Sequence, residues 1–174
     1  RGGQEWCAAV VIGKVKEVHA WTHRPIWPQG KDVVFKPGDR PETLDWELWL
    51  AATPDHLYSP DIHPFKWRGY IEWGAGAFGD MGCHLIDAPN MALGLGVPSF
   101  VTAAKVDDLT EIAWPTGAIV KMEFPGNSHG DVTLTWYEGK KPDGTPYPPE
   151  FPAIVDMMEA FTEEKQPKKS GSVS

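Results

Sequence analysis

The chain lacks the features that membrane proteins and nucleic-acid-binding proteins need. No apolar run in its 174 residues approaches the roughly 20 residues that span a bilayer. A formal net charge of −8 is opposite in sign to the basic surface on which nucleic-acid binding normally depends. We therefore expect neither membrane insertion nor a nucleic acid as a partner.

Cysteine is scarce, with only Cys7 and Cys83 in the whole chain. Their wide separation and their apolar or helical contexts favour free thiols over one disulfide, and neither arrangement fixes a compartment. The chain also has no C-x-x-C spacing, which is a common source of closely spaced zinc ligands. We expect no metal site.

Glycine, proline and tryptophan are abundant, with 18, 17 and 9 residues respectively. This composition indicates a single domain that is rich in loops, and several loops carry indole rings: Trp21, Trp27, Trp67 and Trp73. Two interpretations remain open for these rings. They either pack the loops onto the body of the domain or form pocket walls that face sugar rings.

Patterns of apolar residues predict the secondary structure. Strand-like segments cover residues 13–24, 99–106, 117–124 and 131–138. Helical patterns cover residues 41–52, 79–95 and 150–162. The first helix should carry Leu44, Leu48 and Ala51 on one face, while Pro89 should kink or interrupt the second and Gly94 and Gly96 should end it. Successive strands after the first helices predict an α+β domain with an open, largely antiparallel sheet and helices packed on one face.

The segment Gly74-Ala-Gly-Ala-Phe-Gly79 has the spacing G-x-G-x-x-G of dinucleotide-binding loops. Such a loop should follow an apolar buried strand, yet Arg68 and Glu72 precede this one. It should also be followed after about 20 residues by an acid that binds the ribose, but none lies between Asp87 and Asp107. We therefore interpret the glycines as a close-packed entry to the next helix rather than a pyrophosphate site.

That helix carries a polar stripe made of Asp80, Cys83, His84 and Asp87, beside an apolar stripe made of Met81, Leu85 and Ala88. Asp80 is expected in the first turn, where the helix dipole favours a carboxylate, and in reach of the His84 imidazole. A histidine oriented in this way can take or give the proton of a hydroxyl. The alternatives are a helix cap with a packed histidine, or two ligands of a metal.

Five motifs in this order resemble the Gfo/Idh/MocA family of oxidoreductases: "IGKVKEVHAWTHRPIWPQG", "LDWELWL", "HPFKWRGY", "GAGAFGDMGCHLID" and "LGLGVPS". The resemblance covers about residues 10–140 and is closest to bacterial members with a T-x-R-P-I-W-P-Q-G loop. It implies a parent with an N-terminal Rossmann domain that binds NAD or NADP and a C-terminal α/β domain. Residues 1–12 would then be a remnant of the interdomain helix, and residues 13–174 part of a C-terminal substrate and oligomerisation domain.

The resemblance also implies roles for particular residues. It makes Asp80 and His84 the candidates for substrate binding and proton relay. Candidate substrate-binding residues are His23, Arg24, Trp27, His63 and Asp80. Candidate cofactor-binding residues are Lys66, Trp67 and Arg68. The family's nucleotide glycines and its E-K-P lysine have no counterpart here, so we expect this fragment to be inactive alone.

The function implied is NAD(P)-dependent hydride transfer on a sugar, cyclitol or related polyol, in a homo-oligomer formed through the sheet face. Two alternatives stay open: an NAD-dependent glycoside hydrolase on the same fold, and a non-catalytic interaction module that uses the sheet. The resemblance leaves the compartment, cytoplasm or export in a bacterium, undetermined.

Overall fold

The computed structural model of the chain describes residues 13–127, 129–140 and 143–145. In chain order its elements are β1 (Glu17–Thr22), α2 (Trp46–Leu50), the 3-10 helix η1 (Lys66–Gly69), α3 (Gly76–Leu85), α4 (Asp87–Leu93), β2 (Phe100–Asp107), β3 (Gly117–Asn127) and β4 (Gly130–Gly139). All four predicted strands are present. The helix expected at 150–162, the segment 1–12 and Cys7 lie outside the described residues.

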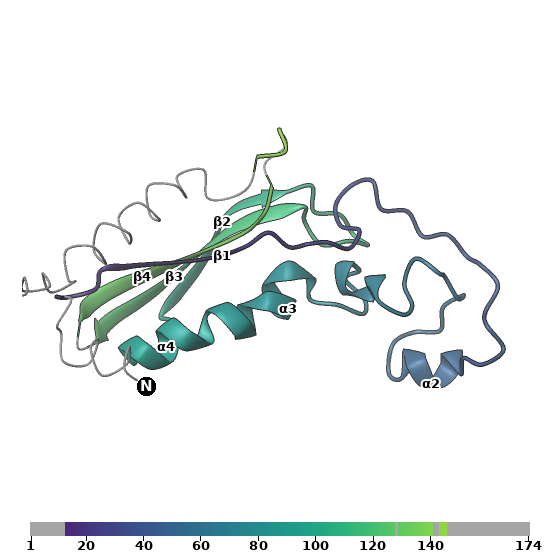
Figure 1. Cartoon of the computed structure of the whole chain (residues 1–174), viewed down its shortest axis with the longest axis horizontal. Helices are drawn as coiled ribbons and strands as arrows, with labels where there is room; N and C mark the ends of the chain where they lie inside the picture. Colours follow the sequence, from purple (N-terminus) through teal and green to yellow (C-terminus); the bar gives the residue numbers. More distant parts are fainter. Residues whose placement is uncertain (1–12, 128, 141–142, 146–174) are drawn as a thin grey trace, which may run out of the picture.

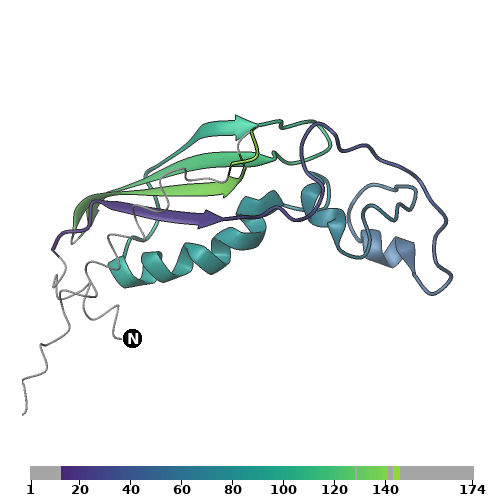
Figure 2. The ribbon, with the colours of Figure 1, turned by 45° about the horizontal axis from the view of Figure 1, so that its top comes forward.

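The four strands form one open sheet in the order β1-β4-β3-β2. β1 runs parallel to β4, whereas the β4–β3 and β3–β2 pairs are antiparallel. Helices α3 and α4 lie end to end along one face of this sheet (Figure 1 and Figure 2). The structure therefore confirms the predicted α+β class, with an open, mainly antiparallel sheet.

The main core lies between these helices and the sheet. Its buried members come from β1, β3 and β4, from the end of α4 and from the segment just after it: Ala20, Leu93, Leu95, Met122, Phe124, Val132, Leu134 and Trp136. Met81 and Leu85 of the predicted apolar stripe pack against it. Ala88 does not, because it is exposed on α4 beyond the break between the helices.

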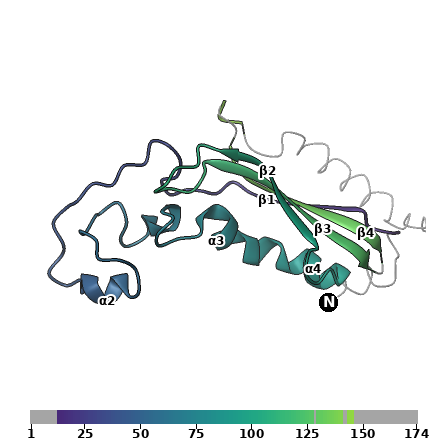
Figure 3. The same cartoon turned by 180° about the vertical axis from the view of Figure 1, so that it is seen from behind.

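A second core holds the loops that extend past the end of the sheet, on the side of α2 (Figure 1 and Figure 3). It buries Val33, Trp46, Leu50, Ile62, Tyr70 and Ala113. The apolar face expected from Leu44, Leu48 and Ala51 is not the face that packs on the core, since Leu48 is 77% exposed while Trp46 is 5% exposed. Trp46 determines the orientation: its ring stacks on Trp49 at 4.6 Å, and its indole N–H donates to the His56 carbonyl at 2.6 Å.

The long predicted helix is divided where proline chemistry requires it. α3 ends at Leu85 and α4 starts at Asp87, because Pro89 offers no N–H to the Leu85 carbonyl and its ring crowds that position. Gly94 ends α4 with a left-handed φ of 62°, as predicted. The start of α3 differs from the prediction, since the helix begins at Gly76. Asp80 is therefore beyond the first turn, which contains no acidic residue.

Candidate functional site

The glycine-rich segment from Gly74 to Gly79, which leads into α3 and forms its first turn, is packed against neighbouring parts of the chain. A Cβ at Gly74 would collide with the carbonyl oxygen of Arg68, and one at Gly79 would collide with the Ala75 side chain. At Gly76 the φ is +62° and a Cβ would lie 2.9 Å from the Trp114 ring, whose N–H donates to the Gly74 carbonyl at 2.8 Å. These glycines make room for neighbouring chain and not for a pyrophosphate. The residues of this turn do not fit a dinucleotide cradle.

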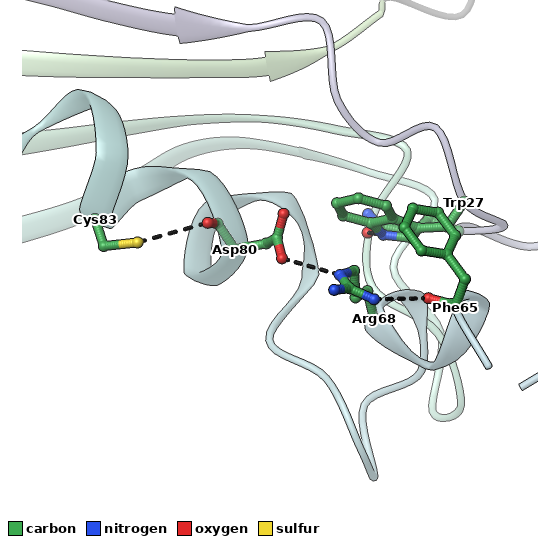
Figure 4. A network of polar contacts seen from close by, with 6 residues as sticks. Trp27, Phe65, Arg68, Asp80 and Cys83 are labelled. Carbon is green, nitrogen blue, oxygen red and sulfur yellow. Dashed lines mark hydrogen bonds and ion pairs between the residues drawn. The ribbon is translucent and has the colours of Figure 1, made fainter. Parts of the chain in front are cut away.

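α3 carries Asp80 to a guanidinium. Arg68 Nε donates to Asp80 Oδ1 at 3.1 Å, and Arg68 Nη1 donates to the Phe65 carbonyl at 3.1 Å (Figure 4). Both side chains of the pair are about one-third exposed, at 27% for Arg68 and 31% for Asp80. The site therefore has one carboxylate oxygen engaged by Arg68 and the other available to a ligand.

The predicted orientation of His84 by Asp80 is not formed. His84 is exposed and has no hydrogen bond or ion pair within the described ranges. Side chains on a helix lean toward its N-terminus, so Asp80 reaches back to Arg68 while His84 projects from the turn that follows. Cys83 beside it is an exposed free thiol whose Sγ lies 3.6 Å from the Asp80 carbonyl. The two predicted catalytic residues thus share a helix face open to solvent without touching.

Trp27 joins the loop after β1 to this pair. Its ring is 4% exposed, and its N–H donates to Gln29 Oε1 at 2.6 Å, while the Gln29 amide donates to the Pro115 carbonyl. The guanidinium carbons of Arg24 and Arg68 lie 5.6 Å and 6.0 Å from its centroid. Arg24 Nε is buried and lacks a hydrogen-bond partner among the residues that the structure describes. The buried Trp27 ring is therefore held in place, and it positions the guanidinium groups of Arg24 and Arg68.

The remaining predicted residues are divided between this cluster and other contacts. Trp67 lies under the Arg68 guanidinium, at 4.6 Å from ring centroid to Cζ. Lys66 is paired with Asp61 at 2.9 Å, and His63 packs against the edge of Trp49 at 5.7 Å. His23 is exposed. The structure thus brings Arg24, Trp27, Trp67, Arg68 and Asp80 together, and leaves His23, His63, Lys66 and His84 outside their direct contacts.

Glu138 is a buried acid that the sequence analysis did not select. Glu138 is 2% exposed, and its Oε2 accepts the indole N–H of Trp136 at 2.9 Å. Burial raises the pKa of its carboxyl to about 7, an effect that the Trp136 hydrogen bond partly opposes. The signal was present in the sequence: Val132, Leu134 and Trp136 alternate toward the core, and Glu138 is the next residue of that series.

Three further acidic and basic groups that the sequence analysis did not select line a pocket of about 580 Å³: His56, Glu72 and Glu111.

Throughout the described ranges, no three His, Cys, Asp or Glu side chains group as a metal site would require. In the same ranges no helix has the length and apolar character to cross a membrane.

Comparison with protein families identifies the family of this chain. A model of the C-terminal α/β domain of an oxidoreductase family, Gfo/Idh/MocA, matches residues 2–108, which is well over half of the chain. No curated protein matches it. The matched range contains Arg24, Trp27, Arg68, Asp80 and His84, and ends just after β2.

Proposed function

The chain belongs to the Gfo/Idh/MocA oxidoreductase family, and we propose that it provides the substrate-facing surface of an NAD(P)-dependent enzyme acting on a sugar, cyclitol or related polyol. The observation that carries the proposal is the Arg68–Asp80 pair set against Trp27, with His84 on the same exposed helix face. Such a pair presents donors and an acceptor side by side, which suits a molecule with several hydroxyl groups.

Oxidation of an alcohol needs an acceptor for the hydride and a group that takes the hydroxyl proton. The side chains of this chain fit the second requirement. Bound NAD(P) supplies the acceptor for the hydride in this family. The turn at Gly74–Gly79 does not fit that group, so its binding falls mainly to residues outside the set described above. The proton of the substrate hydroxyl is the part that Asp80 and His84 can handle.

The geometry suggests a division of roles. Arg68 holds Asp80 Oδ1, which leaves Oδ2 to accept a hydrogen bond from a substrate hydroxyl and to fix its position. His84 is open to solvent and can pass the proton between the hydroxyl and water. Arg24, whose guanidinium lies 5.6 Å from the Trp27 ring centroid, has an unsatisfied buried Nε that offers a further donor.

The test uses an enzyme in which this domain is accompanied by its nucleotide-binding domain. We expect Asp80→Asn and His84→Ala each to lower kcat/KM by about 100-fold or more, the range of lost proton transfer and positioning. The control is Asp87→Asn, which removes an exposed carboxylate on the next helix without touching Arg68. Turnover close to that of the unmodified enzyme in both variants would reject the assignment.

The same assay separates the two reactions compatible with the fold. A net rise in nicotinamide absorbance during turnover indicates a dehydrogenase. Turnover with release of a sugar and no net change in absorbance indicates a glycoside hydrolase that oxidises and then reduces its substrate again. Both outcomes retain the proposed roles of Asp80 and His84, because each reaction moves a hydroxyl proton.

A second proposal concerns association through the sheet. β2 is an edge strand, and every residue from Phe100 to Val106 is exposed, including Phe100 at 61% and Val101 at 56%. An exposed apolar edge strand offers unpaired backbone groups and side chains to another chain. We propose that it belongs to the surface through which copies of this chain form a homo-oligomer.

A further inference from the structure

The pocket of about 580 Å³ has the size of a small-molecule site and lies against the second core. Three aromatic rings line it, those of Phe35, Tyr70 and Trp73. The Tyr70 and Trp73 rings meet edge to face at 5.8 Å, and the Trp73 N–H is already used by Thr53 Oγ1 at 3.3 Å. Because the indole N–H of Trp73 already has a hydrogen-bond acceptor, the ring can offer a ligand only its π surface.

The charged groups of the pocket are mainly negative. His56 Nε2 lies 2.6 Å from Glu72 Oε2, and Glu111 is exposed with no ion-pair partner among the described residues. No lysine or arginine is found among the pocket's lining residues. Even with His56 protonated, two carboxylates face one positive charge. An anionic ligand is therefore disfavoured. A neutral polyol would bury the excess negative charge of the carboxylates without neutralising it, which is also unfavourable.

Backbone pairing joins the two segments that carry these carboxylates. The Ile71 N–H donates to the Ile112 carbonyl at 3.1 Å, and Tyr70 and Ala113 form an antiparallel bridge. This pairing fixes the segment with Glu72 beside the segment with Glu111. A ligand consequently meets a wall whose backbone is already formed, which lowers the ordering cost of binding.

His56 has a positioning role in this arrangement. Its ring packs edge to face on Trp73 at 5.0 Å and lies 6.2 Å from the Phe35 ring, so the imidazole has a fixed place between two aromatic groups. From there it engages only Oε2 of Glu72. Oε1 remains available to accept a hydrogen bond from a ligand.

We propose that this pocket binds a small organic cation, with an ammonium group placed between Glu72 and Glu111 and against the rings of Phe35 and Trp73. Aromatic faces and carboxylates are the two groups that attract such a cation, and here they line the same cavity. The site goes beyond the proposed oxidoreductase function and does not rest on it, since Arg68, Asp80 and His84 do not line this pocket.

The test compares two probes of nearly the same shape by titration calorimetry on the 174-residue chain. Choline carries a quaternary ammonium, and 3,3-dimethylbutan-1-ol has carbon in place of that nitrogen and no charge. We expect choline to bind about tenfold more tightly. Glu72→Gln and Glu111→Gln should each remove most of this preference, whereas the control Glu123→Gln, an exposed acid on β3, should keep it.

Each other outcome overturns the proposal. Equal binding of the two probes would make the pocket a plain apolar slot. Tighter binding of myo-inositol, titrated in the same way as a third probe, would make it a polyol site. Absence of binding by any probe to a chain whose circular dichroism is that of a folded protein would remove the site. None of these results depends on nicotinamide or turnover, so they leave the test of Asp80 and His84 unaffected.

Discussion

Replacing Glu138 with glutamine should stabilise the protein above neutral pH and leave it nearly unchanged in acid. Glu138 is 2% exposed on the core side of β4, and burial raises the pKa of its carboxyl from the ordinary 4.5 to about 7. The folded protein therefore keeps the Glu138 proton in a range where the unfolded chain has lost it. The free energy of unfolding falls as the pH rises from about 4.5 to about 7 and then stays at the lower value.

The size of the effect follows from the gap between the two pKa values. One unit of difference is worth about 1.4 kcal/mol, so the gap from 4.5 to about 7 corresponds to about 3 kcal/mol of lost stability above pH 7. Glutamine has nearly the same shape as the protonated acid and no charge at any pH. Its amide oxygen can accept the Trp136 N–H that Glu138 Oε2 accepts now, so Glu138→Gln should regain most of this free energy.

The measurement is urea unfolding followed by tryptophan fluorescence, for the unmodified chain and for Glu138→Gln, at several pH values from 4.5 to 8.5. Only the difference between the two chains matters, because the other titrating groups contribute equally to both. Glu123→Gln, an exposed acid on β3, is the control and should show no such difference. A difference that is the same at every pH, or one in which glutamine is the less stable form in alkali, would refute the reasoning.

Two further predictions concern two glycines at the ends of helices α3 and α4 and the edge of the sheet. Gly76 and Gly94 share a φ of +62°, but a Cβ at Gly94 meets open space whereas one at Gly76 lies 2.9 Å from the Trp114 ring. In urea unfolding we expect Gly94→Ala to cost about 1 kcal/mol, from left-handed strain alone, and Gly76→Ala to cost about 1–3 kcal/mol more. At the sheet edge, Val101→Lys should shift light-scattering masses from oligomer toward monomer, and an unchanged oligomer would remove β2 from the interface.

The sequence predicted those parts of the fold that depend on local signals. The four strands were found by their strand-like composition, and the break near Pro89 and the cap at Gly94 follow from backbone chemistry that needs no tertiary partner. The buried face of α2 could not be found in this way. Helical spacing favoured the leucines, but Trp46 has more apolar surface to bury, and the cluster that receives it comes from distant loops.

For the candidate site, too, the sequence predicted the relation that is local and missed those that depend on tertiary packing. Spacing on one helix placed Asp80 and His84 on a common exposed face, because that relation is internal to α3. It could not identify Arg68 as the partner of Asp80, since the distance between η1 and α3 is set by how the glycine turn packs. The pocket with Glu72 and Glu111 has the same origin, because its two walls meet only through pairing of distant segments.

The Arg68–Asp80 contact limits how Asp80 and His84 can act on one substrate. Arg68 is itself held by the Phe65 carbonyl and three aromatic rings, so Asp80 is directed toward Arg68 and away from His84. A molecule served by both must therefore lie along the helix face, in contact with each. If it does, the double variant Asp80→Asn, His84→Ala should lose little more kcat/KM than the worse single variant. Losses that multiply would mean that the two residues act independently, and that His84 works away from the hydroxyl that Asp80 binds.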